Sequence, residues 1–405
     1  MLSDNSRPVI EATLPVMDQR IQDIADRFYR HLFDTHPELL DGVFNRGNQA
    51  QGTQQVALAG SIIAFAADLV NTPDQLPEHL LARVGHKHAS LGIEPDQYPI
   101  VHDSLMWAIR DVLGDAVTPQ VAAAWDEVYW LMAYTLIHIE RGIYSARGVR
   151  PHTVWRQWKV RQKIPETDDA MTFVVERTDD RLVKSSLPGQ YVTVQLPLPD
   201  GTRQPRQYSL SRADNGQFRQ FTVKRVHGGG KPDGQCSTLL HDNVSVGDVL
   251  NMSIPFGAVT LDDAAGRPLV FASGGIGITP MAGMLSHLAA AVSRLPIVLL
   301  HADHNEETFA LRNQVLTDIA ALPNASIYLW FEEGGQRRSP VREVFHGLMD
   351  VSQVSLPDNA LYFLCGPVPF MQEVRSALIK GGVSPRDIQY EVFGPDLWQA
   401  DYECE

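Results

Sequence analysis

The sequence predicts a protein of three domains: an all-α domain, a small antiparallel β-barrel and an α/β domain with a parallel sheet. Apolar residues recur first with a period of about 3.6 residues, then alternate as in half-buried strands, and finally form short buried runs between helical stretches. In addition, 405 residues exceed what one hydrophobic core normally covers. We expect these domains at residues 1–147, 153–262 and 266–405.

Composition limits the possible partners and the compartment. The formal net charge of −14 disfavours nucleic acid and anionic membrane, so small molecules are the expected partners. The N-terminus has no basic-then-apolar signal, and no stretch offers about 18 uninterrupted apolar residues for a membrane span. Cys236, Cys365 and Cys404 are too few and too scattered for a disulfide framework or a cysteine-based metal site. We therefore expect a cytoplasmic protein, and a monomer.

The first domain is predicted to be helical because proline-containing turns separate amphipathic stretches, at His36-Pro37, Thr72-Pro73 and Glu94-Pro95. The stretch around Leu81 and Val84 is informative. At about 100° per residue, His88 falls within about 40° of these two residues, whereas His86 points the other way. One histidine thus faces the core of the domain.

A histidine on an apolar face is either a hydrogen-bonded core residue or a ligand, and two neighbours favour the ligand. Glu140 shares a helical face with Leu136 and Ile137, where a buried carboxylate is costly unless it finds a donor. A histidine ligand supplies that donor, because metal-bound imidazoles usually pass their other N–H to an acceptor. Tyr98 is a plausible third member of the group.

The barrel contains a candidate flavin site in the stretch Arg206-Gln207-Tyr208-Ser209-Leu210-Ser211. It lies between two strand-like segments, 188–194 and 221–225. Arg206 suits a pyrophosphate, Tyr208 offers a ring face and a phenol, and the Ser209 hydroxyl suits the flavin nitrogen that accepts hydride. The alternative is an exposed strand in which these residues occur together by chance.

A second candidate segment begins at Gly234, where the chain enters a helix with Gln235, Cys236 and Ser237. The free backbone N–H groups of such a start suit a diphosphate, and Ser237 is a candidate cap. The alternative is a simple capped helix after the glycine-rich loop at 228–233.

The third domain alternates short apolar runs with helical stretches, which is typical of a parallel sheet. The first run leads into Gly274-Gly275-Ile276-Gly277-Ile278-Thr279-Pro280-Met281. Its glycines allow close approach of a dinucleotide, Thr279 is a candidate cap, and Pro280 suits a first helical position. It is not the Rossmann fingerprint, because the third glycine is missing. Each motif taken alone is also compatible with a simple turn.

Together these motifs resemble those of the bacterial flavohaemoglobin family, and the resemblance covers the whole chain. In the helical domain the resemblance rests on the following residues: Phe28-Tyr29, Pro37-Glu38-Leu39, Phe44, Gln54, Leu58, Lys87-His88, Pro95-Asp96-Gln97-Tyr98 and Glu140. The third domain is similar to the nicotinamide-dinucleotide domain of the ferredoxin-reductase-like superfamily. There the resemblance rests on the glycine-rich stretch, Cys365-Gly366-Pro367 and Tyr390-Glu391-Val392-Phe393-Gly394-Pro395.

The resemblance implies haem, FAD and NAD(P)H as cofactors and assigns residues to each. His88 would be the proximal ligand of haem iron, with Tyr98 and Glu140 behind it. Around the rest of the haem would lie Tyr29, Gln54, Leu58, Phe44 and Lys87. The flavin would contact Tyr191, Arg206, Gln207, Tyr208, Ser209, Gln235, Cys236 and Ser237. The nicotinamide side would include Gly275, Ile276, Gly277, Ile278, Thr279, Pro280, Cys365, Gly366, Pro367, Glu391, Val392, Phe393, Gly394 and Pro395. The sequence departs from the family pattern at Cys236, Val392 and the longer 228–233 loop.

The function implied by the resemblance is nitric oxide dioxygenase: NAD(P)H reduces FAD, FAD reduces haem, and ferrous-oxy haem converts nitric oxide to nitrate. Two alternatives stay open, an oxygen- or nitric-oxide-binding globin kept reduced by its flavin domains and a flavin reductase for external acceptors. We expect NADH to be preferred over NADPH, because Glu332-Glu333 would repel a 2′-phosphate. Arg337 and Arg338 follow closely and argue against this preference.

Overall fold

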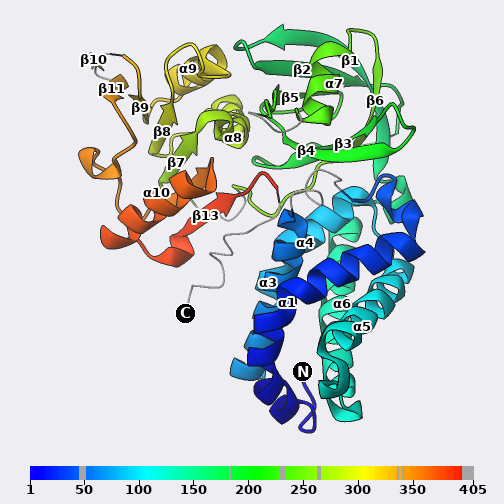
Figure 1. The fold of residues 1–405 in the computed structure, drawn as a ribbon. Helices are drawn as coiled ribbons and strands as arrows, with labels where there is room; N and C mark the ends of the chain where they lie inside the picture. Colours follow the sequence, from blue (N-terminus) through cyan, green and yellow to red (C-terminus); the bar gives the residue numbers. More distant parts are fainter. Residues whose placement is uncertain are drawn as a thin grey trace. The chain divides into compact units, whose positions relative to one another are not determined.

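Figure 1 shows the computed structural model, which describes residues 1–44, 52–181, 184–228, 233–261, 266–334, 337–339 and 342–394. Contacts within the chain group it into two compact units, which are described separately. Unit 1 comprises Met1–Trp155 and Gln195–Pro205, and unit 2 comprises Arg156–Val194 and Arg206–Phe393. The predicted fold class is confirmed: an all-α domain is followed by an antiparallel barrel and then by a parallel α/β sheet.

The helices of unit 1 begin and end where prolines and glycines interrupt the amphipathic pattern. Its long helices are α1 (Arg7–Thr35), α3 (Thr53–Asn71), α4 (Glu78–Leu91), α5 (Tyr98–Leu113) and α6 (Pro119–Arg147). Short 3-10 turns follow at η1 (Pro37–Leu40), η2 (Pro95–Gln97), η3 (Gly114–Ala116) and η4 (Pro151–Thr153). The last helix is closed by Thr118, whose hydroxyl accepts the Val121 N–H, and by Gly148 in the left-handed region.

One helix of unit 1, α3, is long and apolar enough over Gln54–Asn71 to be considered as a membrane span by length and composition alone. In the structure its Ile62, Phe65 and Leu69 are buried in the core cluster shared with α1, α5 and α6. Of this window 28% is buried, so α3 presents one buried face to that core.

The segment Gln195–Pro205 belongs to unit 1 through contacts with η1 and the residues after it. The Arg203 guanidinium donates to both carboxylate oxygens of Asp41, from Nη2 at 2.7 Å and from Nε at 3.1 Å. The Gly42 N–H donates to the Arg203 carbonyl at 2.8 Å. Hydrogen bonding by Arg203 lowers the pKa of Asp41. A bidentate pair between residues so far apart in the chain is not visible in a sequence pattern.

The predicted β-barrel is present as a six-stranded sheet in the order β4-β3-β6-β1-β2-β5. Its strands are β1 (Trp155–Pro165), β2 (Ala170–Arg177), β3 (Tyr191–Pro197), β4 (Arg203–Ser209), β5 (Phe218–Lys224) and β6 (Val249–Ser253). Leu210, directly after β4, forms an antiparallel bridge with Phe221 of β5. Because β4 and β5 are the two edges of the sheet, this bridge closes it into a barrel. The helix α7 (Gln235–Asp242) precedes β6.

The α/β part of unit 2 is a seven-stranded sheet in the order β10-β11-β9-β8-β7-β12-β13, parallel except where β10 pairs with β11. Its strands are β7 (Leu269–Gly274), β8 (Ile297–Asp303), β9 (Ala325–Phe331), β10 (Arg337–Ser339), β11 (Arg342–His346), β12 (Leu361–Cys365) and β13 (Ile388–Glu391). The covering helices are α8 (Ile278–Ala290), α9 (Arg312–Ala321) and α10 (Val368–Lys380). Figure 1 shows α8 and α9 together on one side of these strands, where they form one apolar core with β7, β8 and β9.

Candidate functional site

Three polar side chains of unit 1 meet in its interior: His88 of α4, Tyr98 at the start of α5 and Glu140 of α6. The His88 Nδ1 lies 2.8 Å from Glu140 Oε1 and 3.2 Å from the Tyr98 hydroxyl. The Tyr98 hydroxyl donates to the same Glu140 oxygen at 2.6 Å. The structure thus brings together His88 and Glu140, which helical periodicity placed on apolar faces, and Tyr98, the expected third member of the group.

The buried Glu140 carboxylate determines which atoms of His88 and Tyr98 carry protons. The Glu140 side chain is 3% exposed, so its carboxylate needs donors, and His88 Nδ1–H and Tyr98 O–H supply them. Burial, followed by the charge of Glu140, raises the pKa of Tyr98, which therefore stays a donor. The His88 side chain is 31% exposed although its partner is buried. With the proton on Nδ1, Nε2 of His88 carries a lone pair that suits a metal ion.

His86, two residues away on the same helix, has different surroundings. It is partly buried, and burial together with the nearby positive charge of Arg147 lowers its pKa to about 4. The Tyr98–Glu140 pair is bonded to His88. His86 is thus partly buried as well, although its position on the helix predicted that it points away from the core; the two histidines differ in that His88 is the one bonded to Glu140.

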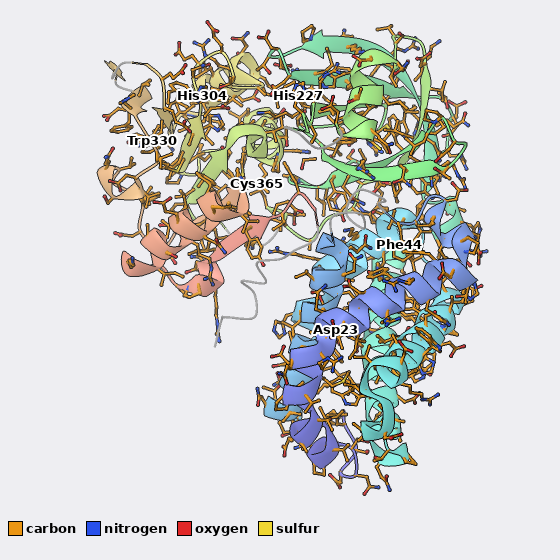
Figure 2. All side chains as sticks on the ribbon, viewed as in Figure 1. Asp23, Phe44, His227, His304, Trp330 and Cys365 are labelled. Atoms are coloured by element: carbon orange, nitrogen blue, oxygen red, sulfur yellow. The ribbon has the colours of Figure 1, made fainter. Side chains whose placement is uncertain are left out.

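An aromatic group around Tyr29 of α1 occupies another part of the same apolar cluster. The Tyr29 ring stacks on Phe33 with centroids 5.7 Å apart and meets Phe44 edge-on at 6.0 Å. Burial raises the pKa of Tyr29, and a hydrogen bond from Gln54 opposes that effect. Leu58 packs against the cluster as well. The resemblance implied Tyr29, Phe44, Gln54 and Leu58 around the haem. In the structure Tyr29 contacts Phe44 and Gln54, and Leu58 packs against the same apolar cluster; Figure 2 marks Phe44.

The residues of unit 1 fit a haem. The fit rests on the donor set: one imidazole whose Nδ1 proton is held by a carboxylate, and a separate buried phenol with an amide beside it. The aromatic and aliphatic residues between them belong to one apolar cluster, which suits a flat apolar ring system. Lys87 is partly buried on α4, and its carbonyl accepts the Ser90 hydroxyl at 2.8 Å.

In unit 2 the flavin motif lies on β4 as predicted. The Tyr208 ring stacks on Phe221 at 5.4 Å, and burial raises the pKa of its phenol. Ser209, the last residue of β4, is buried. Burial raises the pKa of the Cys236 thiol, and the positive charge of Arg206 acts in the opposite direction. Cys236 of α7 therefore lies within electrostatic reach of Arg206 and Tyr208, so both predicted flavin segments come together.

The predicted cap of α7 is wrong. Gly234 is the N-cap, and Ser237 is the third residue of the helix. Its hydroxyl donates to the Gly234 carbonyl at 2.9 Å and accepts the Val226 N–H at 3.1 Å, so it ties the helix start to the chain after β5. Ser237 therefore leaves the first N–H groups of α7, including those of Gln235 and Cys236, without a side-chain cap.

Two other predicted flavin contacts lie on the barrel. Tyr191 begins β3, and its backbone exchanges two hydrogen bonds with Phe256 at 2.8 and 2.9 Å. Gln207 donates from its amide to the Thr193 hydroxyl at 3.4 Å. Of the loop at 228–233, residues 229–232 lie outside the described residues.

The dinucleotide motif meets the Cys365-Gly366-Pro367 segment at the carboxyl ends of β7 and β12. A Cβ on Gly277 would lie 2.2 Å from the Cys365 carbonyl oxygen, so this glycine serves the packing of the loop on the neighbouring strand end. Gly275 has φ +53° and open space beside its Cα. Its backbone thus faces space that a phosphate can use, which fits a dinucleotide. Figure 2 marks Cys365 at the end of β12.

The helix that follows begins differently from the prediction. Thr279 was a candidate cap and Pro280 a candidate first position, but α8 begins at Ile278, which follows Ile276 and Gly277 of the 3-10 turn η6 (Gly275–Gly277). The Thr279 hydroxyl donates back to the Ile276 carbonyl at 3.0 Å. Pro280 is the third helical residue, where its missing N–H would have had no intrahelical partner.

The end of β13 joins this site through Glu391, which pairs with Cys365 across the sheet. Burial, followed by the charge of Glu391, raises the pKa of the Cys365 thiol. Beyond the strand, Val392 is followed by an exposed Phe393 and by Gly394 with φ +139°. Pro395 lies outside the described residues.

The acidic loop after β9 lies beside the end of β8. The Glu333 carboxylate accepts from the Asn305 amide at 3.3 Å and lies 3.2 Å from His304 Nε2, and Glu332 lies 3.3 Å from His304 Nδ1. Figure 2 shows His304 in this part of the sheet. The backbone of Arg337 lies on β10, which β11 separates from β9; the side chains of Arg337 and Arg338 are outside the described residues.

Sequence patterns missed two polar networks of unit 2. The Ser273 hydroxyl lies 2.9 Å from His301 Nδ1, and both side chains are fully buried directly before the glycine-rich loop. Gln314 of α9 donates to the carbonyl of Ser211, the last residue of the flavin stretch. A polar residue within a buried strand signals the first network; Gln314 lies on a helix of ordinary composition, which gives no signal.

Family comparisons divide the chain into the same three parts. The family described as Globin matches residues 26–136, Oxidoreductase FAD-binding domain matches residues 157–261, and Oxidoreductase NAD-binding domain matches residues 271–376.

Relatives and solved structures match nearly the full length. The Flavohemoprotein of Rhizobium meliloti is 38% identical over 98% of this chain and 100% of its own, and that of Bordetella parapertussis is 39% identical over 97% and 99%. The crystal structure of flavohemoglobin from Malassezia yamatoensis, with bound FAD and heme, has a TM-score of 0.88 and 37% identity over 97% of this chain and 100% of that one. The FAD/NAD-binding domain of nitric oxide dioxygenase from Vibrio cholerae is 32% identical, with a TM-score of 0.54, over 59% of this chain and 99% of that one. With the His88–Tyr98–Glu140 cluster, the flavin motif and the dinucleotide loop in a single chain, this protein belongs to the flavohemoprotein family.

Proposed function

We propose that the chain is an NAD(P)H-dependent nitric oxide dioxygenase. The observation that carries the proposal is the His88–Glu140 hydrogen bond of 2.8 Å, in a chain that also contains a flavin motif and a dinucleotide loop. When bound, NAD(P)H and FAD would supply the electrons, and haem would supply the iron at which oxygen and nitric oxide combine to give nitrate.

The helical unit prepares the iron through its own residues. His88 offers Nε2 as the metal ligand, while Glu140 holds the proton on Nδ1 and makes the imidazole a stronger electron donor. Tyr98 donates to Glu140 and keeps the carboxylate oriented toward the ring. Tyr29 stays protonated, because burial raises its pKa, so its hydroxyl would be available to donate a hydrogen bond to a ligand that carries partial negative charge.

The flavin and nicotinamide residues bind and orient. Arg206 would neutralise the pyrophosphate of FAD, Tyr208 would border its ring, and the buried Ser209 hydroxyl would hydrogen-bond the flavin nitrogen. The open backbone at Gly275 would admit the nucleotide phosphates, and Glu391 and Phe393 would border the nicotinamide and flavin rings. The protein acts as a cytoplasmic monomer on oxygen, nitric oxide and NAD(P)H, without nucleic acid or membrane partners.

Two measurements test the proposal. The absorption spectrum of the purified protein should contain a haem Soret band together with flavin bands, and turnover with NADH, oxygen and nitric oxide should form nitrate in proportion to the NADH consumed. A spectrum without a Soret band would show that the protein is a flavin reductase without haem. Haem and flavin together, without sustained nitrate formation, would leave an oxygen- or nitric-oxide-binding globin.

A further inference from the structure

Gln314 of α9 is joined to the barrel by a directional pair of hydrogen bonds. Its amide nitrogen donates to the Ser211 carbonyl at 2.6 Å, and its amide oxygen accepts from the Gln220 amide nitrogen at 2.8 Å. Gln220 also donates to the Ser211 hydroxyl at 3.1 Å. Ser211 and Gln220 are both buried, so the bonds lie where water competes weakly.

Gln314 holds the carbonyl of Ser211, which is the last residue of the flavin stretch Arg206–Ser211. Ser211 lies two residues after Ser209, and its N–H donates to the Gln220 carbonyl at 2.9 Å. With its carbonyl held by Gln314, both backbone polar groups of Ser211 are bonded. Only a carboxamide of this length supplies the donor for Ser211 and the acceptor for Gln220 together, because a glutamate lacks the donor and a leucine lacks both.

The start of α9 is fixed to the barrel at a second point. Leu311, the residue before the helix, is buried and has φ +58°, in the left-handed region that a leucine rarely adopts. This conformation lets its N–H donate to Glu166 Oε2, at 3.2 Å, in the turn between β1 and β2. A strained residue of this kind persists where the surroundings over-determine it. The helix therefore meets the barrel at Glu166 and at Ser211.

The segment before α9 is also connected to the dinucleotide loop, through Phe309, His301 and Ser273. The Phe309 ring, two residues before Leu311, lies 4.1 Å from the His301 ring, and His301 contacts Ser273, the residue before Gly274. On α8, which follows the loop, a Cβ on Gly283 would lie 2.1 Å from the Leu210 carbonyl. Both α8 and α9 thus touch the last two residues of the flavin stretch, Leu210 and Ser211.

We propose that Gln314 is a positioning residue for hydride transfer. It holds the end of the flavin stretch, Arg206–Ser211, at a fixed position relative to the nicotinamide-binding loop. The inference rests on the proposed use of FAD and NADH. The reaction that Gln314 serves moves a hydride from C4 of the nicotinamide to N5 of the flavin, so that the nicotinamide is oxidised and the flavin reduced by two electrons. Gln314 itself touches neither reacting atom and acts through Ser211.

The first test compares Gln314→Leu with Asn313→Leu, which removes a neighbouring exposed carboxamide from the same helix. Anaerobic rapid mixing of the full-length, flavin-loaded protein with NADH should give a limiting rate of flavin reduction lowered by about tenfold in Gln314→Leu, because small displacements of reacting groups cost rate steeply. The half-saturating NADH concentration should hardly change. Asn313→Leu should reduce its flavin at the wild-type rate.

A second readout needs no turnover. In the oxidised protein without NADH, the amide of Ser211 should exchange hydrogen faster in Gln314→Leu than in wild type, and unchanged in Asn313→Leu, because the Ser211–Gln220 pairing loses its support. Gln314→Glu keeps the side-chain shape, can still accept from Gln220 and faces the Ser211 carbonyl with a carboxylate. It should also reduce its flavin slowly, so it decides the matter if Gln314→Leu does not fold.

The proposal is overturned if the flavin-containing fraction of Gln314→Leu or Gln314→Glu is reduced at the wild-type limiting rate. A lower FAD content with an unchanged rate in that fraction would likewise show a purely structural role. These outcomes differ from failure of the proposed function, in which the wild-type protein itself forms no nitrate or carries no haem.

Discussion

At the scale of single residues, Glu140 is the most informative side chain. A carboxylate on an apolar helical face must find donors, and this requirement led from sequence to His88 and Tyr98. The structure has both donors, at 2.8 and 2.6 Å. Helical periodicity and the cost of burying charge were enough for this prediction, because both act over a few turns of helix. The distances themselves depend on how α4, α5 and α6 pack, which periodicity does not specify.

The first prediction is that His88→Ala abolishes haem binding or haem reduction while NADH still reduces a dye through the flavin. The reason is that His88 lies in unit 1, whereas the Arg206–Ser209 motif and the dinucleotide loop lie in unit 2. His86→Ala is the matched control, since its ring lies near Arg147 and the Tyr98–Glu140 pair holds His88. Absorption spectra and dye reduction measure both outcomes. Loss of the Soret band in His86→Ala, with His88 intact, would contradict the assignment.

The second prediction concerns the phenol on the other side of the cluster. Tyr29→Phe keeps the stacking with Phe33 but deletes one hydrogen bond, which contributes on the order of 1 kcal/mol. Oxygen should therefore dissociate from the reduced protein roughly five times faster, as measured by rapid mixing. Glu140→Leu should instead slow turnover, because it acts on the imidazole. An oxygen dissociation rate equal to that of wild type in Tyr29→Phe would remove Tyr29 from its proposed role.

At the scale of helices and strands, the sequence predicted which elements exist and of which type they are better than it predicted the residues at which they begin and end. The buried strands of the α/β sheet appear where short apolar runs predicted them, because parallel strands covered on both faces must be apolar throughout. The caps were wrong at Ser237 and Thr279. In both cases a glycine is the N-cap, and the hydroxyl bonds back to a carbonyl three residues earlier. Several start positions satisfy the capping pattern equally, so tertiary contacts decide among them.

The third prediction tests the contact between α8 and the residue after β4. Gly283→Ala should destabilise unit 2 by about 1–3 kcal/mol, because the new Cβ would lie 2.1 Å from the Leu210 backbone oxygen and something must move. Gly142→Ala is the control: this glycine is also helical, but nothing lies within 4 Å of its Cβ position. There alanine should stabilise by roughly 0.5–1 kcal/mol. Denaturant unfolding followed by flavin and haem absorbance separates the two units. If both substitutions changed the free energy of unfolding equally, α8 would be able to move away from Leu210 without cost.

At the scale of the whole molecule, the order of domains was predictable and the contacts between distant segments were not. Changes in apolar period mark each domain along the chain. The Asp41–Arg203 pair and the Gln314–Ser211 bond join segments more than a hundred residues apart, and no local sequence pattern links their partners. Such contacts depend on the final packing, so only a structure reveals them. The overall charge, by contrast, follows from sequence alone and bears on the choice of nucleotide.

The last prediction is a preference for NADH over NADPH. The protein carries a net charge of −14, and the Glu332 and Glu333 carboxylates lie beside His304 and Asn305 at the carboxyl ends of β8 and β9. A 2′-phosphate would bring about two further negative charges to this corner, whereas free ribose hydroxyls can donate to the carboxylates. The kcat/KM for NADH should therefore exceed that for NADPH, and added salt should narrow the ratio by screening the repulsion. In the double variant Glu332→Gln, Glu333→Gln, the ratio of kcat/KM for NADH to that for NADPH should be smaller still at low salt, while NADH continues to reduce FAD. Equal values for the two nucleotides in the wild-type protein, or a preference for NADPH, would show that a cation such as Arg337 or Arg338 sets the local charge.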